Sequence, residues 1–539
     1  MALLAALCRT NRKEESGYVL ATTALLLIPL MIFAAFAVDV GAWYAEADEA
    51  QRAADAAALG GVVWMPDLSR ATTAVRDIAL ENGYDHNDPD VNVIVERRGT
   101  QGIHVKIETK GETHFGRVVM DEIDITRHAT ANYILPVPLG NPGSALGSGL
   151  DSSPVAGAPR ENLLLALNGY CQGYQNGDPF GTRWFGGSGC GSTQNTRYSD
   201  QGYDFIIDFT GPDGANSPVT GQWDLQIFEP GSCGQNSESG SSARIETTMW
   251  RGDDTLFTDD DNKVPGNLVL GENGSALPRL WDSAACGDAT SQWVKAYEID
   301  ADSNQGRWIL RTRTLAVDAE TSLNSFGLRV VPRNTNTPCG SILPSSSCPQ
   351  LYARTWLPIF IPSTITDVAG TAQTTFGGSP SALFYLANVP EIHKSKVLEI
   401  KLFDPGEGMA NMQVLAPDNT RYPFQRSVLP ENGVQSGFVD NNNTCTVTDP
   451  ALTDTVTALN VAYECLDVTG SIYNGDEVTI RVQIPNNYSC VPDDPLTVPV
   501  EGPNCWWRVR YQPQNTTSGV TDRTTWSIRV LGDPIRLTE

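Results

Sequence analysis

The feature that most constrains this chain is an apolar run near its N-terminus. From Tyr18 to Val38 the sequence has 21 residues without a charged side chain. At a rise of about 1.5 Å per residue, a helix of this length spans roughly 32 Å, which matches the hydrocarbon core of a bilayer. Pro29 lies within the run, and membrane helices often tolerate proline. The run therefore predicts one transmembrane helix.

The charges on either side of the run predict its orientation. Arg9, Arg12 and Lys13 precede it, whereas Arg52 alone is basic in the twenty or so residues that follow. This asymmetry predicts a cytoplasmic leader, residues 1–16, with the bulk of the chain outside. A cleavable secretory signal is the alternative, but the apolar region of such a signal usually has only about 7–15 residues.

Beyond the run, the helix is predicted to continue as a stalk, so that residues 17–60 form a transmembrane helix and an alanine-rich extension. Asp39 is the first carboxylate after the apolar run. Burying a carboxylate inside a bilayer costs much free energy, whereas placing it at the interface costs little. Asp39 is therefore interpreted as the exit point, followed by Trp43 and Tyr44 as an interfacial aromatic belt.

Small residues then recur at spacings of three and four on one face of the predicted stalk. They are Ala47, Ala50, Ala54 and Ala57. Alanine favours helix and permits close approach of a neighbour, so these residues and Asp39 are candidates for helix packing. Two interpretations remain open: the seam packs on the stalk's own domain, or it packs on another subunit.

Three short sequences around the helix carry a family resemblance. A leader ending in "EESG", then "AVDVG" around Asp39, and "QRAADAAALGG" from Gln51 resemble the N-terminal region of TadG-like proteins of tight-adherence (Flp) pilus assembly. The resemblance covers roughly residues 12–62. It implies a single-pass component of the bacterial cell membrane, extracytoplasmic in bulk, whose partners are the membrane and other pilus-assembly components. Prepilin-type cleavage after Gly17 normally requires Glu where this chain has Thr22, so the leader is expected to be retained.

Residues 61–135 are predicted to form a small α+β pilin-like domain beside the membrane. An amphipathic helix is expected over 67–83, with Leu68, Val75 and Ala79 on one face. Alternating residues on both sides of Arg98-Gly99 then predict a hairpin. Residues 136–160 are rich in Pro, Gly and Ser, which predicts a flexible linker.

The remainder of the chain is predicted to be all β. Short alternating runs separated by Gly, Pro, Asn and Asp favour two tandem β-sandwich (jelly-roll-like) domains, residues 161–345 and 346–539. An internal echo supports two copies, because "WILR" and "FGLRV" in the first half correspond to "WRVR" and "WSIRV" in the second. Alternation places eight side chains of these strands inward: Trp308, Leu310, Phe326, Leu328, Trp507, Val509, Trp526 and Ile528. The fold class is therefore mainly β, with an N-terminal transmembrane α-helix.

Cysteine usage predicts an oxidising compartment. Ten of the 11 cysteines lie beyond the linker, an even number, and Cys8 is alone in the leader. Spacing does not determine the connectivity, and the hypothesis adopted is that sequence neighbours pair. The pairs are Cys171–Cys190, Cys233–Cys286, Cys339–Cys348, Cys445–Cys465 and Cys490–Cys505.

Charge and histidine content exclude several function classes. The chain has 63 acidic and 37 basic residues, a net charge of -26, which repels nucleic acid. Of its five histidines only His393 lies in the β region, which strongly disfavours a Ser-His-Asp triad or a His-rich zinc site there. Paired carboxylates are still available for glycoside hydrolysis. The chain is predicted not to be an enzyme.

Two candidate binding features remain in the β region. Asp259, Asp260 and Asp261 offer oxygen ligands to calcium, although the EF-hand spacing fails and an acidic turn is the favoured interpretation. No other cofactor is predicted. Trp506, Arg508 and Arg510 alternate with the inward Trp507, and an outward Trp with two Arg suits a sugar ring or an aromatic partner. Packing against an adjacent loop is the favoured alternative for that face.

These observations predict a membrane-anchored, extracytoplasmic structural or adhesion component of a pilus-like (Tad/Flp) assembly or secretion apparatus. The alternative is a surface carbohydrate-binding protein, or a glycosidase, that uses the same type of anchor and recognises a carbohydrate or another cell-surface ligand.

Overall fold

The structure is a computed structural model of the 539-residue chain. It describes residues 15–65, 68–98, 102–118, 120–133, 137–147, 163–184, 190–191, 193–210, 218–228, 245–252, 262–270, 278–281, 293–304, 306–315, 323–337, 339, 347–362, 364–366, 372–374, 382–418, 420–431, 433–446, 462–490, 505–514, 521–532 and 535–537. The chain divides into two compact units. Unit 1 is Met1–Ile134 with Pro534–Glu539, and unit 2 is Leu135–Asp533.

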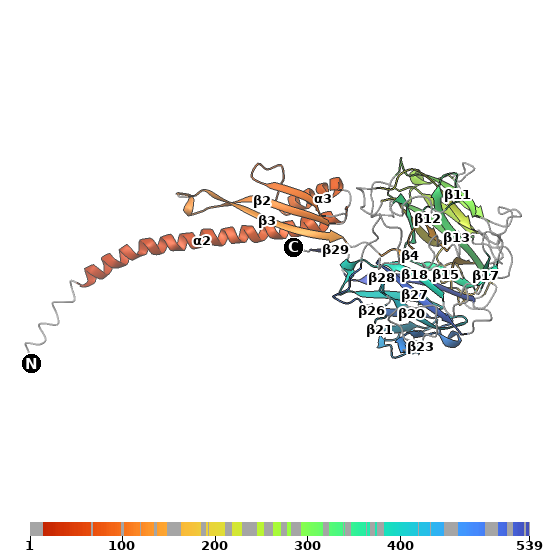
Figure 1. The fold of residues 1–539 in the computed structure, drawn as a ribbon. Helices are drawn as coiled ribbons and strands as arrows, with labels where there is room; N and C mark the ends of the chain where they lie inside the picture. The colour runs from red at the N-terminus through yellow and green to blue at the C-terminus, as the bar shows by residue number, and fades with distance from the viewer. Residues whose placement is uncertain are drawn as a thin grey trace, which may run out of the picture. The chain divides into compact units, whose positions relative to one another are not determined.

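Unit 1 is built on one long helix, α2 (Glu15–Val62), which joins the apolar run and the alanine-rich stalk without a break (Figure 1). A second helix, α3 (Leu68–Glu81), and a four-stranded antiparallel sheet pack against it. The sheet has the order β1 (Asn92–Arg98), β2 (Gly102–Glu112), β3 (Glu122–Tyr133) and β29 (Ile535–Leu537), and a 3₁₀ turn, η1 (Gly116–Val118), lies between β2 and β3. The predicted helix over 67–83 and the predicted hairpin are both present.

The packing of α2 on α3 depends on glycine. A Cβ atom at Gly60 would lie 2.2 Å from Ile78 Cδ1, and one at Gly61 would lie 2.3 Å from Val75 Cγ2. Both distances are far below van der Waals contact, so only glycine lets the two helices approach this closely. The buried face of α3 consists of Ala71, Val75 and Ala79.

The end of the chain returns to unit 1. β29 pairs antiparallel with β3, with Ile535 opposite Tyr133 and Leu537 opposite Ala131. Sequence pattern alone assigns these residues to the second β-sandwich, because a strand of three residues carries too little alternation to reveal its partner.

Unit 2 consists of two large sheets and several short elements. The first sheet has the order β10 (Arg279–Trp281), β9 (Ile245–Trp250), β12 (Arg307–Thr314), β7 (Tyr203–Asp208), β14 (Gln350–Ala353), β4 (Leu139–Gly140), β18 (Ala382–Asn388), β27 (Trp506–Pro513), β20 (Met409–Leu415) and β25 (Leu466–Asp467). The second has the order β11 (Trp293–Asp300), β8 (Gln222–Phe228), β13 (Leu323–Pro332), β6 (Leu164–Asn168), β15 (Leu357–Pro362), β28 (Thr521–Leu531), β19 (Val397–Phe403), β26 (Glu477–Gln483), β21 (Phe424–Leu429) and β22 (Val439–Asp440), with β5 (Ala145–Leu146) beside β13.

The short elements among the described residues of unit 2 are two hairpins and three 3₁₀ turns. They are β16–β17 (Thr364–Thr366, Ala372–Thr374), β23–β24 (Thr444–Thr446, Ala462–Glu464), η4 (Pro265–Asn267), η6 (Glu391–His393) and η7 (Thr469–Ser471).

Strand order in both large sheets is palindromic. In the second sheet β11-β8-β13-β6 is mirrored by β26-β19-β28-β15, and in the first sheet β9-β12-β7 is mirrored by β20-β27-β18. Apart from β5, each strand of the first half therefore has a counterpart in the second, and the echoed sequences fall on β12 and β13 and on β27 and β28. The mainly β, sandwich-like fold class is confirmed, and the palindromic strand order agrees with the predicted internal duplication.

The two copies exchange their first strands. β4 begins the first copy but pairs with β18 of the second, while β14 begins the second copy and pairs with β7 of the first. Both sheets and one contiguous core thus run across residue 345. The boundaries of two separate sandwiches, 161–345 and 346–539, remain a prediction.

The described part of the predicted linker, residues 137–147, is folded. It contains β4 and β5, and Val137, Leu139 and Leu146 are buried in the core of unit 2. Gly140, Gly143 and Gly147 have positive φ, so the glycines that suggested flexibility form turns. This stretch corrects the linker prediction. The remainder of 136–160 lies outside the described residues.

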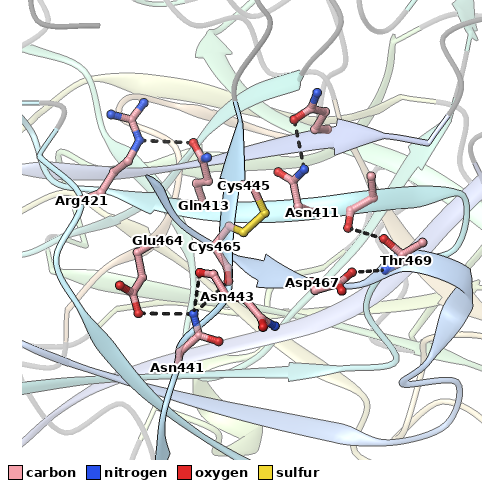
Figure 2. Close-up of a disulfide and its surroundings, with 12 residues drawn as sticks. Asn411, Gln413, Arg421, Asn441, Asn443, Cys445, Glu464, Cys465, Asp467 and Thr469 are labelled. Atoms are coloured by element: carbon pink, nitrogen blue, oxygen red, sulfur yellow. Dashed lines mark hydrogen bonds between the residues drawn. A yellow bond between two sulfur atoms is a disulfide. The ribbon is translucent and has the colours of Figure 1, made fainter. Parts of the chain in front are cut away.

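The core residues and disulfides of unit 2 largely follow the sequence. Seven of the eight side chains predicted to face inward are buried, and Ile528 is partly buried against the same cluster. Four predicted disulfides are present, Cys171–Cys190, Cys339–Cys348, Cys445–Cys465 and Cys490–Cys505. Figure 2 shows Cys445–Cys465 beside Asn441, whose side-chain amide donates to the carbonyl of Cys465 at 2.9 Å. Cys233 and Cys286 lie outside the described residues.

Candidate functional site at the end of the membrane helix

The N-terminal half of α2 is apolar, and its side chains are exposed. Its large side chains between Tyr18 and Val38 are exposed, and among the described residues α2 is the helix long and apolar enough to cross a membrane. The hydroxyl of Thr22 donates to the carbonyl of Tyr18 at 2.8 Å, which satisfies this polar group within the helix itself. Exposed apolar surface of this extent is unfavourable in water and favourable in lipid.

Asp39 lies where this apolar half ends, and its carboxylate is only 1% exposed. Oδ1 accepts hydrogen bonds from the backbone N–H groups of His114 and Phe115, both at 2.9 Å, and Oδ2 accepts one from Gly116 at 2.7 Å. One turn later, Trp43 Nε1 donates to the carbonyl of Glu112 at 3.2 Å. Two consecutive turns of α2 therefore hold the tip of the β2–β3 hairpin.

The tip is shaped to receive a carboxylate. Three successive N–H groups point at Asp39, the arrangement by which turns and helix N-termini bind anions. A Cβ atom at Gly116 would lie 3.1 Å from Asp39 Oδ2 and 2.9 Å from Thr113 Cγ2, so glycine permits the close approach. The interpretation of Asp39 as a simple interface marker is incomplete, because its carboxylate is buried and fully bonded.

The alanine seam lies inside unit 1. Ala47, Ala50, Ala54 and Ala57 are all buried, and α2 packs there against α3, β2 and β3. Polar contacts border the seam: Tyr84 Oη donates to Glu46 Oε1 at 3.1 Å, and Gln51 Nε2 donates to the carbonyl of His128 at 3.0 Å. Of the two interpretations, packing on the stalk's own domain is the one that these contacts describe.

The predicted outward face on β27 is not exposed. Trp506 is 2% exposed and packs edge-on against Tyr385 at a ring distance of 5.9 Å, and Arg510 is buried as well. Arg508 is half-buried, and its guanidinium donates to the carbonyl of Pro417 at 3.1 Å. Alternation identified the inward Trp507 correctly but could not show that the other face of this interior strand is also covered. These contacts agree with the favoured interpretation, packing, and not with stacking of a sugar ring.

Metal binding finds no geometric support in the part of the chain that the structure describes. There, no group of three or more His, Cys, Asp or Glu side chains is arranged to hold an ion. Asp259, Asp260 and Asp261 lie outside the described residues.

Sequence reasoning missed a buried polar centre where the copies of unit 2 meet. Asp178 of the first copy accepts a hydrogen bond from Tyr203 Oη at 2.6 Å, and burial raises its pKa. Asp522 of the second copy accepts the N–H groups of Gly406 and Glu407, both at 2.8 Å, while burial raises its pKa to about 7.

Charged pairs also link the two copies. Arg197 of the first copy is paired with Glu477 of the second, and Lys401 donates to the same carboxylate at 2.9 Å. Burial opposes ionisation of Glu477, but Arg197 and Lys401 hold its pKa below the usual range. No sequence signal distinguished these acids from surface acids, because the groups that surround them come from distant parts of the chain.

Comparison with known proteins bears on the N-terminal region. No curated protein matches the chain. A solved structure titled "Structure of PNGF-II in P21 space group" aligns over 83% of this chain and 81% of that one, with 9% identity and a TM-score of 0.10, which is too low to inform fold or function. Residues 17–63 match the family model described as putative Flp pilus-assembly TadE/G-like. The chain is thus similar to TadE/G-like Flp pilus-assembly proteins over the membrane helix, the Asp39 junction and the alanine seam.

Proposed function

We propose that the chain is a membrane-anchored structural or adhesion component of a Tad/Flp pilus apparatus. One observation supports the proposal above all. The family match, residues 17–63, covers a helix whose side chains are exposed over Tyr18–Val38 and whose later part, from Asp39 onward, packs against the rest of unit 1. The exposed apolar half of α2 anchors the protein in lipid, and the other half holds the folded part of unit 1 beside the membrane.

The proposal places unit 2 outside the cytoplasm. Arg9, Arg12 and Lys13 precede the span, which favours a cytoplasmic N-terminus. Four disulfides in unit 2 require an oxidising compartment. A disulfide-linked unit of two sheets on a membrane anchor is suited to display at the cell surface or to assembly with other subunits. The proposed role of the protein is therefore structural rather than catalytic.

A deletion strain complemented with two chains tests this function. The first is the natural protein, and the second has residues 15–38 replaced by an unrelated transmembrane helix of equal length. Loss of pili or of surface adhesion in the deletion strain, restored by the natural chain, supports the proposal, and normal piliation in the strain contradicts it. If the chain with the exchanged helix fully restores piliation, the apolar half of α2 serves only as an anchor. If that chain reaches the membrane normally but does not restore piliation, the apolar half contacts other pilus components.

The topology is tested separately on intact spheroplasts. External protease is expected to digest unit 2 while a tag fused to the leader survives. Protection of a C-terminal tag contradicts an extracytoplasmic unit 2.

A further inference from the structure

The described tip of the β2–β3 hairpin, residues 113–118 and 120–121, combines a fixed position with exposed apolar side chains. Phe115 is 62% exposed and Met120 is 45% exposed, although both lie in a turn that polar residues usually occupy. Tyr44, on the adjacent turn of α2, is 70% exposed. These three side chains are the apolar surface to be explained.

We propose that this tip is a second membrane contact, in which Phe115 and Met120 enter the interfacial layer of the bilayer beside the point where α2 leaves it. The inference rests on the proposed function, since it requires that Tyr18–Val38 span the membrane.

The Asp39 junction fixes the depth of the tip. The apolar run ends at Val38, so Asp39 lies at the membrane surface whenever the run spans the hydrocarbon core. Three backbone N–H groups of the tip are bonded to that carboxylate, and Trp43 holds the strand that leads into it. The tip therefore lies at the level of the lipid headgroups.

Continuity of the apolar surface identifies lipid as the occupant. Phe36 and Val38, the last large residues of the run, are exposed, and Phe36 packs edge-on against Trp43 at a ring distance of 6.3 Å. The apolar surface thus continues from the span through the aromatic turn toward Phe115. Aromatic residues with an apolar body are favoured at this depth.

The charges of the tip indicate which lipids suit it. Arg117 is exposed and faces Glu112 at 3.5 Å, Glu122 is paired with Lys110, and Asp121 is exposed nearby. The charges of the described residues around the tip therefore include no surplus of basic side chains that would favour strongly anionic headgroups, so insertion is driven by apolar side chains. A zwitterionic bilayer is the matching surface.

Photocrosslinking of the full-length protein in nanodiscs of phosphatidylcholine and phosphatidylethanolamine tests the contact. A p-benzoylphenylalanine residue replaces Phe115, Met120, Leu27 or Leu80 in four separate variants, and lipid adducts are measured by mass spectrometry. Leu27 lies within the span and reports anchoring. Leu80 is the matched control, because it is 52% exposed but lies on α3, which packs near Gly60.

Adducts at positions 27, 115 and 120, at least tenfold above those at position 80, support the inference. Adducts at 27 without adducts at 115 and 120 overturn it and leave the membrane anchor intact. Equal labelling at 80 and 115 also overturns it, because unit 1 would then contact lipid without selectivity. Absence of adducts at 27 refutes the proposed anchor and the inference together.

Discussion

Unit 1 and unit 2 bury polar groups in opposite ways. In unit 1 the buried surface of α2 is made mostly of alanines and includes one carboxylate, Asp39, both of whose oxygens accept backbone hydrogen bonds. In unit 2 the core is made of large aliphatic and aromatic side chains, and the buried Asp522 accepts two N–H groups on Oδ1, while Oδ2 has no hydrogen bond of normal geometry to a described residue.

The difference shows what each carboxyl group contributes. A carboxylate that accepts three N–H groups is stabilised in its charged form, so Asp39 holds one loop at one place. A buried carboxyl group with few donors favours its neutral form, as the raised pKa of Asp522 indicates. Asp39 therefore attaches the β2–β3 tip to α2. Burial of the Asp522 carboxyl group instead costs free energy, which the packing of the surrounding core offsets.

The largest expected effect is on the shared core of unit 2. Trp526→Ala removes a side chain that packs against Phe384 and Tyr511, both at ring distances of 6.0 Å, and is expected to destabilise unit 2 by about 3–5 kcal/mol. Because one cluster spans both copies, hydrogen exchange is expected to accelerate in β12 as well as in β27. Acceleration confined to the second copy would show that the copies unfold independently.

A smaller effect is expected from enlarging the alanine seam. Ala54→Leu overpacks the contact of α2 with its own domain and is expected to destabilise unit 1 by about 1–3 kcal/mol, measured by urea unfolding in detergent. Ala34→Leu, on the exposed apolar half of the same helix, is the matched control and is expected to leave stability unchanged. If Ala54→Leu leaves unit 1 stable but abolishes co-purification of pilus components, the seam serves another subunit.

A local effect is expected at Asp39. Asp39→Asn replaces one accepting oxygen with an N–H donor, so amide exchange at His114, Phe115 and Gly116 is expected to rise by about tenfold or more. Membrane insertion is expected to be unchanged, because the span ends at Val38. Asp48→Asn, exposed on the same helix, is the control, and unchanged exchange at the tip in both variants contradicts the attachment role of Asp39.

A pH-dependent effect is expected from Asp522. Its pKa is about 7 in the folded protein and about 3.8 ordinarily, so the folded state binds the extra proton between these values. The contribution of Asp522 to the unfolding free energy therefore falls as pH rises from about 4 to 7. Asp522→Asn mimics the neutral form and is expected to flatten this slope in urea unfolding between pH 5 and pH 8. A slope unchanged by the substitution would mean that other groups cause it.

Much of the fold could be predicted from local pattern. The long helix, the hairpin after Val91 and the inward aromatics follow from periodicity or from residue type. The four described disulfides agree with the hypothesis that sequence neighbours pair, which the cysteine spacing alone did not determine. Asp39 was singled out for its place in an apolar run, but its partners are 75 to 77 residues away, and no local pattern encodes them. The exchanged pairing of strands β4 and β14 was not predicted, because a strand of two to four residues is too short for its sequence to indicate which strand it pairs with.

The return of β29 to unit 1 has a mechanical consequence. Tyr133, near the point where the chain passes from unit 1 to unit 2, is paired with Ile535, near the point where it returns. A pull on unit 2 therefore reaches unit 1 by two chain segments, one continuous with β3 and α2, and the other held to unit 1 by the pairing of β29 with β3. A proteolytic cut in the first segment would leave the load on this short strand pairing.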